Sequence, residues 1–140
     1  MNEQIKEQVR SLIDKAADVC VSSVDAKGYP NVKRMFTLPN ENYNVYFFST
    51  NVSSMRYDHF KANPRACIYF SDNVAGVQLI GDMEVCTDHD IKARFWSDGD
   101  EKYYPDGIDD PDYCIFRFTA HTGRYYCAGA STDFSAGELA

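Results

Sequence analysis

The stretch FFSTNVSSMRYDHFKANP, residues 47–64, leads from an apolar run into a sequence that begins like a helix. Ser53 is a candidate N-cap for this helix, and Pro64 requires the helix to end by Asn63. A helix start offers unpaired N–H groups and about half a positive charge, to which Arg56 adds a guanidinium. This combination suits a phosphate group. The alternative is an ordinary capped surface helix with Arg56 in solvent.

Strand-like segments lie on both sides of this stretch. We expect strands at residues 18–25, 31–38, 44–50, 65–71, 74–86 and 113–120, and a short seventh at 123–129. Apolar residues at helical spacing predict an N-terminal helix over 2–16, and a short helix is expected over 91–96. Six to seven antiparallel strands with flanking helices predict a mainly β protein, a small barrel whose closure removes unpaired sheet edges. We expect a single domain over residues 1–130 and a flexible tail at 131–140.

Composition limits the classes of protein to which the chain can belong. Its 140 residues, 14% of them aromatic, are enough to bury the core of one domain. The net charge of −7 argues against a nucleic-acid partner. No charged-then-apolar leader and no apolar run of about 18 residues is present, so neither export nor membrane insertion is expected. Five cysteines without a CxxC pair predict free thiols in a reducing cytoplasm and no metal site.

The charge is unevenly distributed along the chain. Residues 33–65 carry five basic and two acidic side chains, whereas residues 82–114 carry eleven acidic and three basic ones. A positive segment in an acidic protein favours a small anion over a polyanion as ligand. A chance fluctuation of surface charge is the alternative.

The run from Asn31 to Val85 contains short blocks in a defined order. They read Arg34-Met35-Phe36-Thr37-Leu38, Ser49-Thr50-Asn51, Ser54-Met55-Arg56 and Asn63-Pro64-Arg65-Ala66, followed by Val77, Leu79 and Gly81. In these blocks the sequence resembles the FMN-binding split-barrel family typified by pyridoxamine 5′-phosphate oxidase, and the first three blocks align without a gap. The Gly-Ile-Asp-Asp-Pro loop at residues 107–111 is similar to that of the smaller general-stress-protein branch of the same superfamily.

The resemblance implies a split β-barrel that binds FMN without a covalent bond, as a homodimer with the flavin between its subunits. Strand alternation independently places Arg34 and Phe36 on one face. Trp96 has two interpretations, a cover for the flavin or plain core packing. The resemblance implies that Arg34, Arg56, Thr50 and Ser54 bind the phosphate, that the backbone of Met35, Phe36 and Thr37 runs along the ring, and that Gln78 faces its polar edge. Ser49 and Trp96 complete the set of candidate cofactor-binding residues.

Several positions depart from the family's pattern. Met55 stands where the family has the arginine of its S-R-K block, Pro39 where it has a lysine, and Gly76 where it has a flavin-facing glutamine. The residues after 130 contain no counterpart of the segment that holds pyridoxal phosphate in the oxidases. The resemblance therefore implies a flavin-dependent oxidoreductase acting on another substrate rather than a true pyridoxamine phosphate oxidase.

Three other functions are compatible with the same barrel. The first is an FMN-binding stress or sensor protein without turnover, the second a haem-binding protein, and the third an interaction module without a cofactor. Hydrolase and metal-site patterns give no competing assignment, since the sequence has no GxSxG motif and its three histidines lie in different elements.

Overall fold

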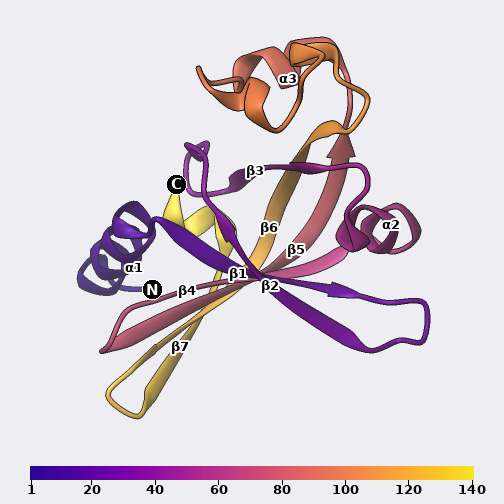
Figure 1. Ribbon diagram of the computed structural model, residues 1–140. Coiled ribbons are helices and arrows are strands. Elements are labelled where there is room, and N and C mark those ends of the chain that lie inside the picture. Colours follow the sequence, from indigo (N-terminus) through magenta and orange to yellow (C-terminus); the bar gives the residue numbers. More distant parts are fainter.

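Seven antiparallel strands form one sheet in the computed structural model, which describes residues 1–140 (Figure 1). The strands are β1 (Asp18–Val24), β2 (Pro30–Phe36), β3 (Val45–Asn51), β4 (Arg65–Ser71), β5 (Ala75–Cys86), β6 (Tyr113–Cys127) and β7 (Ala130–Ser135). Their order is β2-β1-β4-β5-β6-β3, and β7 pairs with β6. The sheet closes where Leu38, just after β2, donates a backbone hydrogen bond to Phe47 of β3 at 3.2 Å. The predicted mainly β class is confirmed.

Helices α1 (Glu3–Lys15) and α2 (Met55–Ala62) pack apolar side chains against the core of the barrel. The Asn2 side chain caps α1 by accepting a hydrogen bond from the N–H of the third helical residue at 2.8 Å. Phe60 of α2 is buried and packs edge-on against Phe116 of β6, with 5.3 Å between the ring centroids. This contact fixes α2 against the sheet, so its first turn has a defined position next to the end of β3.

The last two strands expected from the sequence, residues 113–120 and 123–129, form one continuous strand, β6. Its pairing with β5 shifts by one residue at His121, which has no partner in β5. Such a β-bulge bends a strand without ending it. Gly81 permits the close approach, since a Cβ there would lie 2.0 Å from the carbonyl oxygen of Thr119. The break that suggested two strands is therefore a bulge rather than a turn.

The prediction of a flexible tail at residues 131–140 is wrong. The segment completes strand β7 and then forms the short 3₁₀ helix η3 (Ala136–Leu139). Phe134 is only 5% exposed, and Leu139 is fully buried. Arg10 of α1 donates two hydrogen bonds, from Nε and Nη2, to the Leu139 carbonyl oxygen at 2.8 and 2.6 Å. The small polar residues of the segment alternate with apolar ones that complete the core.

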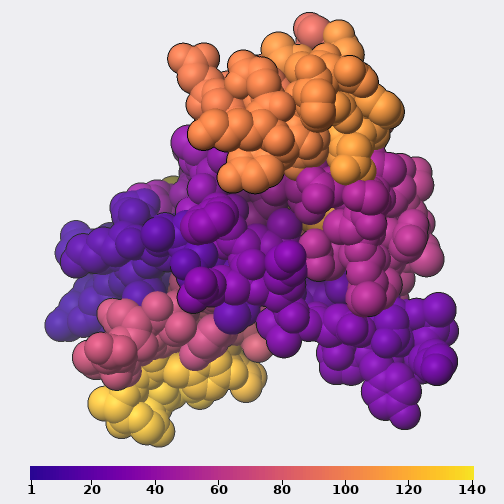
Figure 2. Space-filling view, in the orientation of Figure 1, coloured from indigo at the N-terminus to yellow at the C-terminus, as the bar shows by residue number.

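A second, smaller core lies beneath helix α3 (His89–Arg94) and the acidic loop that follows it. Its six buried side chains are Phe47, Cys86, Phe95, Tyr104, Tyr113 and Ile115. The loop contains two short 3₁₀ helices, η1 (Asp100–Lys102) and η2 (Gly107–Asp109), and α3 begins two residues before the helix expected at 91–96. Figure 2 shows this part of the chain as an orange lobe on one end of the molecule. Because Phe47 belongs to β3, the lobe packs directly against the strand that leads into α2.

The five cysteines are all free, and two of them, Cys86 and Cys114, are buried. Burial raises the pKa of the Cys67 thiol to about 11 and that of Cys114 to about 12, so both stay protonated at neutral pH. No group of three His, Cys, Asp or Glu side chains has an arrangement that could hold a metal ion. None of the helices has the length and apolar character needed to cross a bilayer.

Candidate functional site

The turn between β3 and α2 is a capped helix start, but its cap lies one residue later than predicted. Ser54, not Ser53, caps α2 by accepting a hydrogen bond from the Tyr57 N–H at 3.3 Å. Ser53 is instead bound to Asp112, because its N–H and its hydroxyl both donate to the Asp112 carboxylate, and the preceding Val52 N–H donates to the Asp112 carbonyl oxygen. The Ser53 donors are therefore occupied within the chain, whereas the first N–H groups of α2 and the Ser54 hydroxyl proton remain as donors for a ligand.

Arg56 lies in the first turn of α2, with its guanidinium partly buried and without an ion-pair partner. Its Nε atom is inaccessible to solvent and makes no hydrogen bond. Burial lowers the pKa of the Arg56 guanidinium, yet an arginine remains charged at neutral pH because its ordinary pKa is so high. A buried N–H without an acceptor costs about 1–3 kcal/mol, and an anionic ligand would remove that cost. Arg56 and the start of α2 thus suit a phosphate or another small anion.

The two predicted residues of β3 differ in exposure. Thr50 is buried, with 8% exposure, and its carbonyl oxygen accepts a hydrogen bond from the Tyr104 hydroxyl at 3.1 Å. Ser49 is exposed. Thr50 therefore supports the strand from the core side, and Ser54 is the more accessible hydroxyl next to the first turn of α2.

The predicted residues of β2 alternate between the core and the outer face of the sheet. Met35 is buried, whereas the Arg34 side chain and Phe36 are 75% and 80% exposed. Arg34 Nε lies 3.7 Å from a carboxylate oxygen of Asp18, and an ion pair this exposed contributes little to stability. The Thr37 hydroxyl donates a hydrogen bond to the backbone after α1 at 3.2 Å. Arg34 and Phe36 therefore share an exposed face, as the alternation predicted.

The two arginines predicted to bind the phosphate, Arg34 and Arg56, have no common ion-pair or hydrogen-bond partner in the structure. Arg34 extends into solvent from β2, while Arg56 is partly buried at the start of α2. Ordering a mobile arginine costs up to about 2 kcal/mol of side-chain entropy, and most of this cost would fall on Arg34. Of the two candidates, Arg56 is therefore the one whose ordering on binding would cost less.

One row of residues crosses the outer face of the sheet and links Arg34 to Gln78. The strand register pairs Arg34 with Cys20, Cys20 with Tyr69, and Tyr69 with Gln78. Because neighbouring strands are about 4.8 Å apart, Arg34 and Gln78 are separated by roughly 14 Å along this face. Gln78 is partly exposed there. The structure thus brings two of the predicted cofactor-binding residues onto one surface, at a separation that a flat ring system with its side chain can span.

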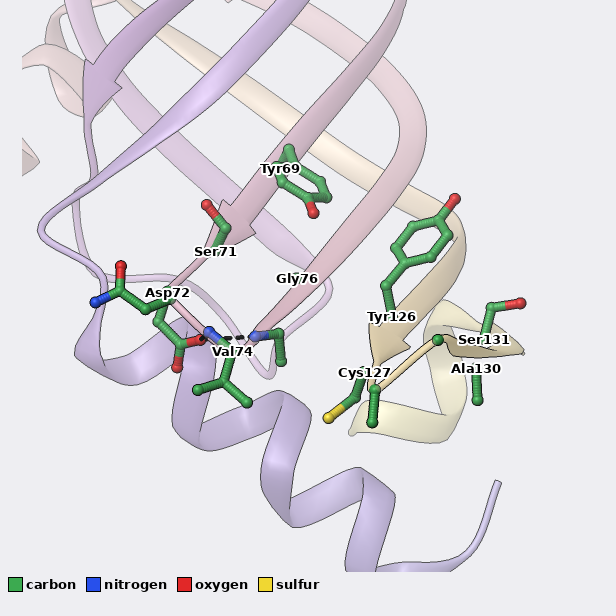
Figure 3. A pocket seen from close by; sticks show the side chains of 13 residues that line it. Tyr69, Ser71, Asp72, Val74, Gly76, Tyr126, Cys127, Ala130 and Ser131 are labelled. Atoms are coloured by element: carbon green, nitrogen blue, oxygen red, sulfur yellow. Dashed lines mark hydrogen bonds between the residues drawn. The ribbon is translucent and has the colours of Figure 1, made fainter.

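A groove of about 630 Å³ lies on the same face, between the β4–β5 and β6–β7 turns (Figure 3). Tyr69 and Tyr126 flank Gly76 in this groove. A Cβ at Gly76 would lie 2.0 Å from the Tyr69 hydroxyl oxygen, so Tyr69 occupies the space that a side chain at residue 76 would need. The lining contains no arginine or lysine. The groove therefore suits an uncharged, flat part of a ligand better than a phosphate.

Trp96 packs inside its own chain, in the second core. Its ring lies edge-on to Tyr113, with 5.3 Å between centroids, and 6.4 Å from the ring of Tyr104. These contacts agree with core packing, the second interpretation given for this residue. A role for Trp96 as a cover for the flavin stays a prediction.

Two residues of the acidic loop, Tyr104 and Asp112, bind the end of β3 and the turn into α2, and these contacts were not predicted from the sequence. The single proton of the Tyr104 hydroxyl is shared between two acceptors, the Thr50 carbonyl oxygen and the side-chain oxygen of Asn51. Asp112 accepts two hydrogen bonds from Ser53. The Gly-Ile-Asp-Asp-Pro motif indicated the loop, and the pairing of Asn51 with Tyr113 places the adjacent Asp112 at the turn, whereas the position of Tyr104 follows only from the packing of its side chain.

Comparison with known proteins identifies the family of this barrel. Residues 5–127 match the family model described as pyridoxamine 5′-phosphate oxidase. A solved structure from Clostridium acetobutylicum is 35% identical, with all of both chains covered and a TM-score of 0.89. That protein is described as related to general stress protein 26 of B. subtilis, of the pyridoxinephosphate oxidase family. A comparison with curated proteins gives no match.

Two further solved structures share the fold at lower sequence identity. A pyridoxamine 5′-phosphate oxidase-related, FMN-binding protein from Nostoc punctiforme is 14% identical, with a TM-score of 0.72, over 93% of this chain and 86% of its own. A haem-binding protein from Mycobacterium smegmatis is 17% identical, with a TM-score of 0.75, over 99% of this chain and 61% of its own. At these identities the likeness concerns the fold alone, and the predicted split-barrel type is confirmed. On the family model and the 35% identical relative, the chain belongs to the pyridoxamine 5′-phosphate oxidase family.

Proposed function

We propose that this protein binds FMN, with the phosphate at the start of α2 and the ring along β2, and uses the flavin as a redox cofactor. The observation that carries the proposal is the buried Nε of Arg56, which has no partner beside a helix start. Membership of the family supports FMN over other phosphate ligands, as does the FMN-binding relative from Nostoc punctiforme.

Each part of FMN would meet groups of matching chemistry. The dianionic phosphate would accept hydrogen bonds from Arg56, the Ser54 hydroxyl and the first N–H groups of α2, and Arg34 would add a second positive charge. The ring would lie against the backbone of residues 35–37, on the face of the sheet that also carries Gln78. Bound FMN supplies hydride and electron transfer, while the protein binds it, orients it and limits its access to solvent. We assign no side chain as a general acid or base.

An absorbance spectrum of the purified protein, recorded before and after addition of FMN, tests this proposal. We expect flavin bands that stay with the protein after gel filtration, and bleaching of those bands by NADH, NADPH or another reduced donor. Flavin bands that no donor bleaches would favour a sensor without turnover. A Soret band would instead favour a haem protein, and a protein that stays colourless with FMN would contradict the proposal.

The proposal includes a homodimer that holds the flavin between its subunits. The outer face carries exposed apolar side chains at Val32, Phe36 and Ile80, which are 68%, 80% and 42% exposed. Large exposed apolar groups on one face are typical of an interaction surface, and an isologous pair is the commonest assembly of identical chains. These residues would form the centre of the interface.

Replacing Phe36 with aspartate should convert the dimer into a monomer. The substitution places a charge in the proposed interface, and an unpaired charge there would lose its water without gaining a partner. Sedimentation velocity of the protein without flavin measures the outcome. Tyr103→Asp is the control, since Tyr103 is equally exposed, at 75%, but lies in the acidic lobe. A wild-type protein that sediments as a monomer would contradict the dimer.

A further inference from the structure

We infer that Asp112 is a positioning residue for the phosphate site, because it holds the β3–α2 turn in the conformation that presents Ser54 and Arg56. This inference rests on the proposed FMN function. It adds the part of the chain that holds the phosphate site in its binding conformation before a ligand is present. Asp112 belongs to the acidic lobe and is 56 residues beyond Arg56 in the sequence. Its effect on a ligand would be indirect, through the conformation of the turn.

Asp112 binds the turn through three hydrogen bonds. The Val52 N–H donates to the Asp112 carbonyl oxygen at 2.7 Å. The Ser53 N–H and hydroxyl donate to the two carboxylate oxygens of Asp112 at 2.8 and 3.1 Å. Ser53 directly precedes Ser54, the cap of α2, so fixing Ser53 fixes the direction in which the helix begins. The first N–H groups of α2 and the Arg56 side chain are thereby aimed before any ligand arrives.

Asp112 is itself anchored in the lobe. Its N–H donates to one carboxylate oxygen of Asp110 at 2.9 Å, and the other oxygen accepts from the Asp106 N–H at 3.1 Å. The buried Lys92 of α3 donates from Nζ to the Asp110 carbonyl oxygen at 3.1 Å. The Tyr113 hydroxyl donates to the Lys92 carbonyl oxygen at 2.9 Å. A continuous set of hydrogen bonds therefore connects α3 and the second core to the start of α2.

The negative charge of Asp112 should lower the affinity of the site for a phosphate, whereas the hydrogen bonds of Asp112 should raise it. A carboxylate close to a helix start reduces the positive potential there and repels a dianion. The hydrogen bonds of the same carboxylate hold the turn in place, so that a ligand does not have to order it on binding. Asparagine at this position keeps the shape and an acceptor for the Ser53 N–H but has no charge. Alanine has neither the charge nor the two carboxylate hydrogen bonds to Ser53 and keeps only the backbone bond to Val52, so the pair of variants separates the two effects.

The test compares the affinities of Asp112→Ala and Asp112→Asn for FMN and for riboflavin. Riboflavin lacks the phosphate, so the ratio of the two affinities reports on the phosphate site, whereas a general loss of stability would weaken both ligands. We expect the preference for FMN over riboflavin to be about three- to tenfold lower in Asp112→Ala than in Asp112→Asn, the cost of ordering one or two groups on binding. Asp112→Asn should prefer FMN at least as strongly as the wild type.

Asp109→Ala is the matched control, because Asp109 lies in the same loop, is exposed and pairs only with His89, at 2.7 Å. It removes one carboxylate from the loop and should leave the preference for FMN unchanged. If Asp112→Ala does not fold, Ser53→Ala removes one of the same hydrogen bonds and should lower the preference about twofold. Equal preference in the alanine and asparagine variants overturns the inference while FMN binding stands. A wild type that binds riboflavin as tightly as FMN overturns the proposed phosphate site itself.

Discussion

Replacing Arg56 with alanine should weaken FMN binding by about 1.5–3 kcal/mol, roughly a 10- to 150-fold rise in Kd. The substitution removes charge-assisted hydrogen bonds from a partly buried guanidinium to the phosphate. Because Arg56 has no partner within the chain, the protein without flavin should lose little stability. Quenching of FMN fluorescence during a titration measures the affinity, and urea unfolding measures the stability.

Two further variants separate charge from geometry at this position. Lys61→Ala removes a positive charge from the exposed last turn of the same helix and should leave the Kd for FMN nearly unchanged. Arg56→Lys keeps the charge but loses the planar fork, so its affinity should lie between those of the wild type and Arg56→Ala. An unchanged Kd in Arg56→Ala would remove this residue from the phosphate site.

Replacing Phe134 with alanine should lower the free energy of unfolding by about 3–5 kcal/mol, as expected for a large aromatic removed from a core. Phe134 is 5% exposed. Its ring packs so closely on Gly123 that a Cβ added to this glycine would lie only 2.3 Å from the nearest ring atom. A domain of this kind has roughly 5–15 kcal/mol of stability, so the loss would be a large part of the total. Urea unfolding followed by circular dichroism gives the value.

The exposed Ser131 of β7 supplies the control for this prediction. Ser131→Ala should change stability by no more than about 0.5 kcal/mol, because the side chain is exposed. If Phe134→Ala were as mild as Ser131→Ala, the C-terminal segment would not be part of the core in solution.

Most strands and both longer helices could be predicted from the sequence because their signals are local. Alternating apolar residues, turn-forming residues and Pro64 determine where β1 to β5 and α2 begin and end to within a few residues. The C-terminal strand was missed because Phe134 is its only large apolar residue, and its stability comes from pairing with β6 and from the buried Phe134 and Leu139. The bulge at His121 was read as a strand end for a related reason, since only the partner strand shows that pairing resumes.

The candidate site could be predicted in part, to the extent that it depends on neighbours in sequence. The cap, the helix start and Arg56 lie within one short stretch, and the order of the blocks led to the family. Whether Ser53 or Ser54 caps α2 depends on Asp112, which the pairing of β3 with β6 places next to Ser53. The partners and exposure of Arg34 likewise depend on tertiary contacts that no local pattern contains.

The uneven charge of the sequence also has a structural explanation. The two segments meet in the structure, where Arg94 of the acidic segment pairs with Glu41 of the positive one at 2.7 Å and Asp112 is bound at the β3–α2 turn. Asp112 thus places one carboxylate of the acidic segment next to the turn that leads into α2. Arg56, without a partner among these acids, is the residue on which the interpretation as an anion site now depends.

A crystal structure of the protein grown with FMN tests the proposed phosphate site most directly. We expect phosphate oxygens within about 2.7–2.9 Å of the Arg56 guanidinium, with further hydrogen bonds from the first N–H groups of α2 and the ring against the outer face of β2. An FMN phosphate bound elsewhere, with Arg56 Nε still lacking an acceptor, would contradict the proposed site.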